Sequence, residues 1–571
     1  MIELDQSQQE AASVEPDERQ VVFAGPGAGK SEVVGALAAS LVDKGILPED
    51  ILIISFSRAA VDVVRRRTSA VVDEGHVVDV STIDALAARL LADHGDGESE
   101  FRGYEETIKA ARGLLTEADE PLLADVQHVI VDEVQDVVGV RAEFVLSLLA
   151  KGVSSDAGFT LLGDPLQALY DFQLGSGDVT SQAFLDMVTM RWTPDERELT
   201  GQHRSRSDDA DRVAAARRDL MATSTDRRVQ QLRILLADLV PLGELDPDAA
   251  ADIAEWDGST ALLCDTNARA GLAADRLAAQ GVPVTLATSA LDPGIPAWVA
   301  QVVGDRSGLL SRSDFTAVAE TIGLPQQDEL WWSLLDLAAG PRGVDLDRLL
   351  QRLVDPRQAR RIGGRPQPRV VASTVHRAKG LEFDNVVLVD PLDWDRRDSS
   401  PQDQASLLYV GMSRARGRLT TTAGVPTRGW YRYERSRLRP WVRRSPRGHG
   451  ATGMIMEPAH ARALGPVDHD LTVHVGAAVR WRRGDDHWTA DGDDVPSWVG
   501  TVDDEPVART TIEFGEIVRR LRFNAYGRIP GLVGGRMEGL ETIVDPRRTD
   551  GRRVWIGARV TGEVQLDWSE S

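Results

Sequence analysis

The stretch VVFAGPGAGKSEVV, residues 21–34, changes character twice along its length. An apolar, β-branched run leads into small residues and glycines, and a Lys-Ser pair then enters a segment compatible with a helix. Glycine at Gly25, Gly27 and Gly29 lets backbone N–H groups turn inward, and the start of a helix adds partial positive charge. The stretch predicts a strand, a phosphate-binding loop and a helix; a simple glycine-rich turn is the alternative.

Two side chains in this stretch are those that a phosphate loop requires. Lys30 would neutralise the β- and γ-phosphates of a nucleotide, and the hydroxyl of Ser31 would ligate Mg²⁺. The usual first glycine of the pattern is Ala24 in this chain. The motif is therefore one residue short of its strict form, and the rest of the chain has to decide which kind of nucleotide-binding protein this is.

Composition sets broad limits on the class of protein. The chain has 571 residues, 42% of them hydrophobic, which is enough for several folded domains. No apolar run is long enough to span a bilayer, and the acidic start MIELDQSQQE is unlike a targeting signal, so we expect a cytoplasmic protein and no membrane. The single cysteine, Cys264, excludes an internal disulfide. A net charge of −24 argues against nucleic-acid binding through overall positive charge, but permits a local basic groove.

Short apolar runs of strand length recur along the chain with helix-compatible segments between them. Buried strands that alternate with helices predict parallel α/β sheets. The expected strands are Val21–Ala24, Ile51–Ser55, His128–Val131, Phe159–Leu162, Ala261–Cys264, Val370–Ser373 and Asn385–Val389.

Two of these strands end in polar motifs at the edge where open parallel sheets place ligands. In VIVDEVQD, Asp132 would coordinate Mg²⁺ and Glu133 would polarise the attacking water, the alternative being a solvated acidic turn. In LLGDPLQALYDF, Gln167 would sense the γ-phosphate. Tyr170 and Phe172 in the same stretch are either core residues or stacking platforms for bases.

The second half of the chain carries STVHRAKGLEF (residues 373–383) and LLYVGMSRARGRL (residues 407–419). Arg414 lies in the second of these, and Arg204 lies in GQHRSRS. Arginines that come from another part of the chain can stabilise the charge of phosphoryl transfer if the fold brings them in. Each of the two taken alone would be read as a surface arginine.

Taken together, these motifs resemble superfamily 1 DNA helicases of the UvrD/Rep/PcrA type, in the same order through residues 1–425. LDQSQQEAA resembles the family's Q motif with Gln8 as the adenine-reading glutamine, and SFSRAA resembles the motif in which an aromatic residue, here Phe56, stacks on single-stranded DNA. Motifs II to VI are matched by DEVQD, GDPLQALYDF, QHRS, TVHRAKGLEF and LLYVGMSRAR. By position, Glu382 would join the nucleotide site and His376 would face DNA.

The resemblance implies ATP and Mg²⁺ as cofactors and ATP-driven 3′→5′ movement on single-stranded DNA. Three positions depart from the family pattern. Glu32 stands where an arginine usually helps to bind adenine, His203 stands where a tyrosine stacks on the base, and Ile83-Asp84 replaces an aromatic-His pair. These changes affect adenine recognition and DNA contact and leave the phosphate chemistry in place.

The fold that the resemblance implies is α/β, with two RecA-like parallel-sheet motor domains, small and mainly helical insertions, and a C-terminal β-rich domain. The expected division is 1–195 for the first motor domain, with a short insertion at about 86–125, and 196–287 plus 369–425 for the second. Residues 288–368 would form a reduced helical insertion. Residues 426–571 would form an arginine- and aromatic-rich linker followed by the β-rich domain.

The segment from Arg428 to Arg447 holds eight arginines and one glutamate, interleaved with aromatic residues that include Trp430 and Tyr431. Basic side chains next to stacking rings are typical of a surface that binds DNA. The alternative is a solvated linker that packs its aromatic residues on the motor. Beyond residue 451, short alternating segments predict strands, in a domain that could hold a protein partner.

Three functions remain open from the sequence. The first is a DNA helicase that acts on single-stranded or 3′-tailed DNA in repair or replication restart. The second is a translocase that does not unwind DNA, or the motor subunit of a larger complex that displaces proteins or serves anti-phage defence; the short insertions favour it. The third, a regulatory binding protein with degraded catalysis, conflicts with the intact Lys30, Asp132, Glu133, Arg204 and Arg414.

Overall fold

The computed structural model divides into two compact units, each built from several pieces of the chain. One unit comprises Met1–Val240, Ala378–Asp384 and Leu392–Leu419, and the other comprises Pro241–Arg377, Asn385–Pro391 and Thr420–Ser571. The described residues are 4–55, 78–95, 103–170, 174–175, 177–287, 294–359, 361–363, 369–394, 400–446, 450–466, 470–488, 494–521, 529–548 and 552–569. The four-part domain division drawn from the sequence stays a prediction.

The first unit is built on a parallel sheet with strand order β3-β2-β4-β5-β1-β6. Its strands are β1 (Arg19–Ala24), β2 (Ile51–Ser55), β3 (Asp79–Thr82), β4 (His128–Asp132), β5 (Gly158–Gly163) and β6 (Asp195–Leu199). Successive side chains point to opposite faces, so Val22 and Ile53 join one apolar core while Val21 and Leu52 join another. Each face of this sheet is therefore buried.

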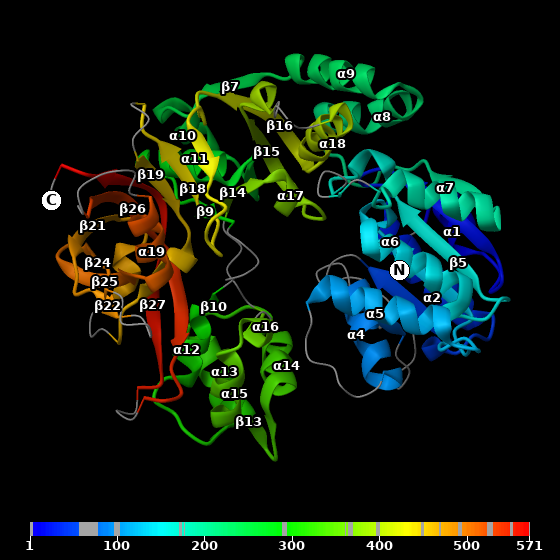
Figure 1. The fold of residues 1–571 in the computed structure, drawn as a ribbon, viewed down its shortest axis with the longest axis horizontal. Helices are drawn as coiled ribbons and strands as arrows, with labels where there is room; N and C mark the ends of the chain where they lie inside the picture. The colour runs from blue at the N-terminus through cyan, green and yellow to red at the C-terminus, as the bar shows by residue number, and fades with distance from the viewer. Residues whose placement is uncertain are drawn as a thin grey trace. The chain divides into compact units, whose positions relative to one another are not determined.

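Helices cover both faces of this sheet (Figure 1). Residues of α1 and α2 belong to one core, and residues of α4 to α7 belong to the other. The helices of the unit are α1 (Gln6–Ala12), α2 (Lys30–Asp43), α4 (Ile83–His94), α5 (Tyr104–Glu117), α6 (Gly139–Ser147), α7 (Ser181–Trp192), α8 (Asp208–Ala222), α9 (Thr225–Ala237) and α18 (Pro401–Met412).

A second six-stranded sheet has the order β7-β16-β15-β8-β14-β9. Its strands are β7 (Pro241–Glu244), β8 (Thr260–Cys264), β9 (Thr285–Leu286), β14 (Val370–Thr374), β15 (Phe383–Val389) and β16 (Ala415–Ala423). The pairs β8–β14, β9–β14, β8–β15 and β7–β16 are parallel. The helices α10 (Pro247–Glu255), α11 (Asn267–Ala279) and α17 (Val375–Ala378) lie along this part of the chain. All seven strands expected from the sequence are confirmed as strands.

Between β9 and β14 the chain forms a small, mainly helical module with its own apolar core. Its elements are α12 (Ala297–Val303), α13 (Arg312–Thr321), α14 (Gln327–Ala338), α15 (Leu346–Leu353), α16 (Pro356–Ala359) and a sheet of β11 (Leu309–Leu310), β13 (Gly343–Asp345) and β12 (Ala339–Gly340). Among the described residues, every helix of the protein is too short or too polar to cross a bilayer.

The C-terminal region forms an antiparallel sheet with order β17-β18-β19-β27-β26-β21-β24-β25-β20, which confirms the expected β-rich region. Its strands are β17 (Trp430–Arg432), β18 (Trp441–Arg444), β19 (Ala451–Met456), β20 (Ala461–Ala463), β21 (Ala478–Arg483), β24 (Trp498–Val502), β25 (Glu505–Thr510), β26 (Gly531–Val544) and β27 (Val554–Asp567). A two-stranded sheet of β22 (His487–Trp488) and β23 (Asp494–Val495) and the helix α19 (Ile512–Arg520) complete the region.

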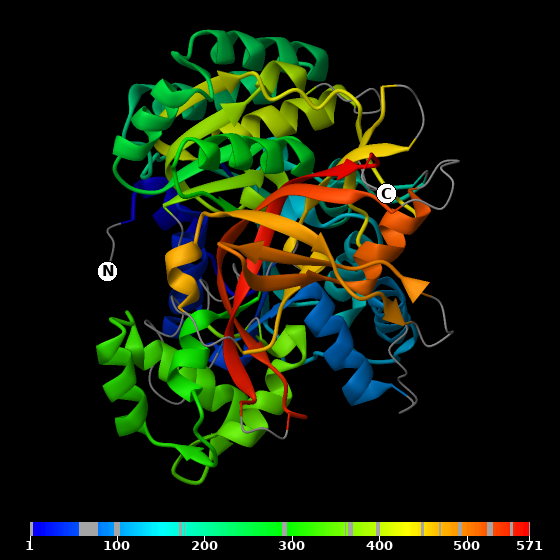
Figure 2. The same cartoon turned by 90° about the vertical axis from the view of Figure 1, so that its left-hand side faces the viewer.

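The hairpin of β26 and β27 joins the C-terminal region to the helical module (Figures 1 and 2). One end of the hairpin contributes Met537 and Val564 to the C-terminal core, while the other end contributes Val554 to the core of the helical module. The short strand β10 (Ile295–Pro296) pairs with β26 immediately before α12. Arg553 and Asp347 form an ion pair at the far end, with their charged atoms 2.5 Å apart.

The segment expected to be an arginine- and aromatic-rich linker is part of this sheet. Trp430 and Trp441 pack against the apolar core around β8, β14 and α11, and Tyr431 packs against the C-terminal core. Two arginines stack on these rings, Arg443 over Trp430 at 5.6 Å and Arg444 over Tyr431 at 5.2 Å. The Trp430 and Tyr431 rings thus pack partly against apolar cores, and their role in DNA binding stays a prediction.

The buried side chain of His460 makes the stability of the C-terminal core depend on pH. It is buried against Phe514, its Nδ1 accepts a hydrogen bond from the Glu457 backbone at 2.9 Å, and burial lowers the pKa of His460 to about 4. In the unfolded chain this histidine binds a proton below about pH 6.5, whereas the folded protein keeps it neutral down to about pH 4. Stability is therefore lost as the pH falls through this window.

We expect this histidine to remove about 2 kcal/mol of stability between pH 7 and pH 5. The substitution His460→Asn keeps an acceptor for the Glu457 backbone but carries no proton at either pH. Urea unfolding of both proteins at the two pH values measures the difference. An identical pH dependence in the variant would contradict the assignment.

Candidate functional site

The loop between β1 and α2 has the backbone of a phosphate cradle. Gly27 and Gly29 have φ of 79° and 78°, in the left-handed region that favours glycine. A Cβ at Gly27 would overlap the Gln202 side chain, and one at Gly29 would overlap that of Gln8. The N-terminus of α2 begins at Lys30, and Ser31 follows it in the first turn. The loop therefore offers backbone N–H groups, a cation and a hydroxyl at the start of one helix.

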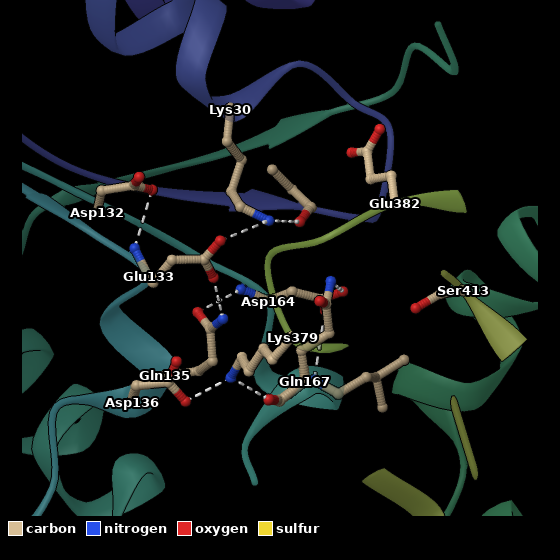
Figure 3. Close-up of polar contacts among 12 residues, drawn as sticks. Lys30, Asp132, Glu133, Gln135, Asp136, Asp164, Gln167, Lys379, Glu382 and Ser413 are labelled. Carbon is tan, nitrogen blue, oxygen red and sulfur yellow. Dashed lines mark hydrogen bonds and ion pairs between the residues drawn. The ribbon is translucent and has the colours of Figure 1, made fainter. Parts of the chain in front are cut away.

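The acidic pair lies at the end of strand β4, which is separated from β1 by β5 in the same sheet (Figure 3). Glu133 has φ of 56°, a left-handed conformation that is rare outside glycine and is held only where the surroundings impose it. This turn places Glu133 Oε1 3.9 Å from Lys30 Nζ. The predicted phosphate-binding lysine and the predicted water-orienting carboxylate therefore lie side by side.

The two carboxylates differ in their electrostatic surroundings. Burial, followed by the charge of Glu133, raises the pKa of Asp132 to about 7. Burial acts on Glu133 in the same direction, but Lys30 and Lys379 outweigh it, and the pKa of Glu133 is held below its ordinary value. For Asp132 burial thus outweighs the charge of the nearby Lys30, whereas for Glu133 the charges of Lys30 and Lys379 outweigh burial.

A chain of side-chain hydrogen bonds leads from this pair toward Arg414. Gln135 donates to Glu133 and accepts from the Asp164 backbone at 3.0 Å. Asp164 accepts from Gln167 Nε2 at 2.9 Å, and Gln167 Oε1 accepts from Arg414 Nη2 at 2.8 Å. Gln167 lies in the short 3₁₀ helix Pro165–Gln167 that follows β5. The structure therefore brings Gln167 and Arg414, 247 positions apart, into direct contact.

Lys379 joins the same network from the motif TVHRAKGLEF. Its Nζ pairs with the Asp136 carboxylate, donates to the Gln167 carbonyl at 2.6 Å, and lies 5.6 Å from the centre of the Tyr170 ring. Burial, reduced by the charge of Lys379, raises the pKa of Asp136 to about 6. The site residues predicted from the sequence do not include Asp136, Asp164 and Lys379. Each of these three stands inside a motif, and a charged residue inside a motif is a signal from which a place in the site could have been predicted.

Arg204 lies on the other side of Arg414. Its Nη1 is 2.9 Å from Glu382 Oε1, and its Nη2 donates to the Ser413 carbonyl at 3.1 Å. Burial raises the pKa of Glu382, but Arg204 and Arg416 outweigh it and hold the pKa below its ordinary value. Burial, followed by the nearby Arg204, lowers the pKa of Arg414 to about 10. Both predicted arginines thus lie in one positively charged cluster.

The residues predicted to read adenine lie at the outer end of the phosphate loop. Gln8 is buried, with its Oε1 accepting from the Asp5 backbone at 3.0 Å and its Nε2 donating to the Ala28 carbonyl at 2.9 Å. The ring of His203 is 2.7 Å from Asp5, and its backbone N–H donates to the Gly27 carbonyl at 3.0 Å. Beside the loop is a small, open pocket. Its lining includes Pro26, Gln202, Arg204, Met412 and Ser413.

These residues fit a nucleotide with Mg²⁺. Mg²⁺ is usually held by one or two carboxylates together with substrate phosphates and waters, and it does not require a cage of protein ligands. Within the described part of the chain, no group of three or more His, Cys, Asp and Glu side chains could hold a metal by itself. The chain offers a buried carboxylate, Asp132, and a hydroxyl at a helix start, Ser31, which suit this mode of binding.

The residues predicted to face DNA are divided between the two units. Tyr170 belongs to the first unit, and burial, followed by Asp136, raises its pKa to about 12. His376, Trp430 and Tyr431 belong to the second unit. Phe56 and Phe172 lie outside the described residues. The role of each in DNA binding stays a prediction.

Comparison with known proteins gives two domain matches. Residues 4–117 match the UvrD/REP helicase N-terminal domain, and residues 369–421 match the UvrD-like helicase C-terminal domain. No curated protein matches the chain.

Two solved structures show distant similarity. A Pif1 helicase from Bacteroides, in complex with ADP-AlF3 and ssDNA, has 12% identity and a TM-score of 0.32, over 75% of this chain and 94% of that one. The DUF1998 helicase MrfA bound to DNA has 9% identity and a TM-score of 0.34, over 74% of this chain and 48% of that one. The likeness to a known family rests on the two domain matches: residues 4–117 and 369–421 are similar to the N-terminal and C-terminal domains of UvrD-like helicases.

Proposed function

We propose that this protein hydrolyses ATP to move 3′→5′ along single-stranded DNA and that it unwinds duplexes in DNA repair or replication restart. The observation that carries the proposal is the grouping of Lys30, Glu133, Gln167, Arg204 and Arg414 in one unit with the phosphate loop. Such a grouping of a cation, a carboxylate and arginines from distant motifs is what phosphoryl transfer requires. The two helicase domain matches agree with it.

Each residue has a distinct task in this proposal. The β1–α2 loop and Lys30 bind the phosphates, and Ser31 and Asp132 hold Mg²⁺. When bound there, Mg²⁺ would offset the negative charge of the phosphates. Glu133, kept ionised by Lys30 and Lys379, orients and deprotonates the attacking water.

The remaining polar residues serve the far side of the nucleotide and the adenine. Arg204 and Arg414 offset the charge that develops during transfer, Gln167 senses the γ-phosphate, and Glu382 contacts the nucleotide while it holds Arg204. Gln8 and His203 contact the adenine. The Gln8 amide uses one N–H and one oxygen lone pair in hydrogen bonds to the protein. One N–H and one lone pair therefore remain to bind a base.

Movement along DNA would follow from stacking of successive bases on aromatic rings. The proposed stacking residues are Tyr170, Phe56, Phe172 and His376, since stacking tolerates any base sequence. Tyr170 lies against Lys379, which also contacts Asp136 and Gln167. A base stacked on the Tyr170 ring would therefore affect the nucleotide site through Lys379. Trp430 and Tyr431 would contribute through the arginines stacked on them.

A translocase that does not unwind DNA, or a motor subunit of a larger complex, is the second candidate. The helical module at 295–362 is joined to the C-terminal region by the β26–β27 hairpin and the Arg553–Asp347 ion pair. A module held in this way is suited to act as a platform for a protein partner. In that case strand separation would need the partner.

Steady-state ATP hydrolysis with and without single-stranded DNA, alongside unwinding of 3′-tailed and 5′-tailed duplexes in one buffer, tests both candidates. We expect strong stimulation by DNA and unwinding of the 3′-tailed duplex alone. Stimulation without unwinding would select the translocase. Unwinding from a 5′ tail would contradict the proposed direction, and hydrolysis indifferent to DNA would contradict both candidates.

A further inference from the structure

Arg217 is a buried cation that belongs to none of the sequence motifs. It lies on α8, with 6% of its surface exposed, and its stem packs against the phosphate loop. A Cβ added at Gly25 would stand 2.7 Å from Arg217 Cδ, so the close approach depends on glycine at that position. Arg217 therefore touches the loop that binds phosphate, although it comes from a helix that follows the motif GQHRSRS.

Two carboxylates hold the guanidinium of Arg217. Its Nε donates to Asp164 Oδ1 at 3.3 Å, and its Nη1 donates to Glu198 Oε1 at 2.5 Å. The two partners differ in burial, since the Asp164 side chain is fully buried and the Glu198 side chain is half exposed. Glu198 has water as an alternative partner for its charge, whereas Asp164 depends on Arg217.

The hydrogen bonds of Asp164 have a fixed direction. A carboxylate only accepts, so the Gln167 amide must turn its NH₂ group toward Asp164. The carbonyl oxygen of that amide is then left to face Arg414 Nη2 at 2.8 Å. The orientation of the Gln167 amide, and with it the anchoring of Arg414, follows from the charge on Asp164.

We propose that Arg217 is a positioning residue that holds the Asp164 carboxylate in place and thereby orients Gln167 toward Arg414. The inference rests on the proposed ATP hydrolysis and adds a residue on α8 to its machinery. Without Arg217, the buried Asp164 carboxylate would lose its ion-pair partner and turn away from its present position. The Gln167 amide would then lose the acceptor that sets its direction, while the phosphate loop itself would stay intact.

The substitution Arg217→Met tests this, with Arg218→Met as the matched control because Arg218 is the exposed neighbour on the same helix. At saturating single-stranded DNA we expect Arg217→Met to lower kcat by about 10- to 100-fold and to change the KM for ATP by less than about 3-fold. Arg218→Met should stay within about 2-fold of wild type. Arg217→Lys, which keeps a cation beside Asp164, should recover most of kcat.

A double-mutant cycle separates positioning from a purely structural role. If Arg217 acts through Gln167, then Arg217→Met placed on Gln167→Ala should change kcat by less than about 2-fold further. Losses that multiply would overturn the inference, as would wild-type kcat in Arg217→Met. Should Arg217→Met fail to fold, Arg217→Gln takes its place in the cycle, where a non-additive loss supports the inference and a multiplied loss overturns it.

The failures of the two proposals are distinguishable. A wild-type protein that hydrolyses no ATP overturns the proposed function and this inference together. A wild-type protein with DNA-stimulated hydrolysis and an unaffected Arg217→Met overturns the inference alone.

Discussion

Replacing Arg414 with alanine should leave ATP binding in place and lower DNA-stimulated hydrolysis by about 10³-fold or more. Arg414 is buried, lies beside Arg204, and is held by Gln167 Oε1 and by the Val410 carbonyl at 3.1 Å. A guanidinium fixed in this way can offset the charge that develops during transfer without having to reorganise. Its loss removes stabilisation of the transition state and not of the bound substrate, so kcat should fall while nucleotide affinity is kept.

Arg418→Ala is the control for this substitution, because Arg418 is an exposed arginine four residues further along. Fluorescent-nucleotide binding and steady-state hydrolysis with DNA measure the two quantities separately. Wild-type turnover in Arg414→Ala would contradict the proposed site. Thermal unfolding of both variants shows whether a loss of activity comes from a loss of fold, since Arg414→Ala also removes a buried side chain.

The substitution Glu133→Gln should lower kcat by about 10²- to 10⁴-fold while ATP binding is retained. Glutamine has the shape of glutamate and still offers an oxygen to Gln135, but it cannot take a proton from water. The charge that faces Lys30 at 3.9 Å also disappears, which frees this lysine for phosphate. The variant should therefore accumulate in an ATP-bound state on single-stranded DNA.

Glu196→Gln, an exposed carboxylate on β6 of the same sheet, is the matched control. Retention of nucleotide and of single-stranded DNA on a sizing column, with single-turnover hydrolysis in parallel, measures the trapped state. Rapid turnover by Glu133→Gln would refute the role given to Glu133. Loss of ATP binding with slow turnover would instead make Glu133 a binding residue.

The elements nearest to the site follow from local sequence. The apolar runs at residues 21–24 and 128–131 form β1 and β4 because each run is long enough to be buried on both faces of a parallel sheet. The glycines themselves also indicate the left-handed backbone at Gly27 and Gly29, where the loop leaves no space for a Cβ. Glu133 has an equally unusual φ of 56°, but its sequence gives no sign of it because the surrounding turn imposes that conformation.

The roles of charged residues outside the motifs cannot be predicted from the sequence in the same way. Arg217 looks like any arginine on an amphipathic helix, and only its approach to Gly25 and Asp164 sets it apart from Arg218. The basic neighbours of Trp430 and Tyr431 predict a DNA surface, and the structure adds that one side of each ring packs against an apolar core. The composition of a short segment does not reveal which of its faces another part of the chain covers.

The sequence by itself determined where the strands and motifs lie along the chain, the phosphate loop and the resemblance to UvrD-like helicases, because each depends on residues a few positions apart. The tertiary structure decided which charges meet. Lys379 pairs with Asp136 across 243 positions, and Arg414 reaches Gln167 across 247. Such contacts depend on how the sheets and helices are connected and packed, and burial then fixes their strength by removing water from around them. For that reason the direction of the Gln167 amide and the part played by Arg217 emerged only from the fold.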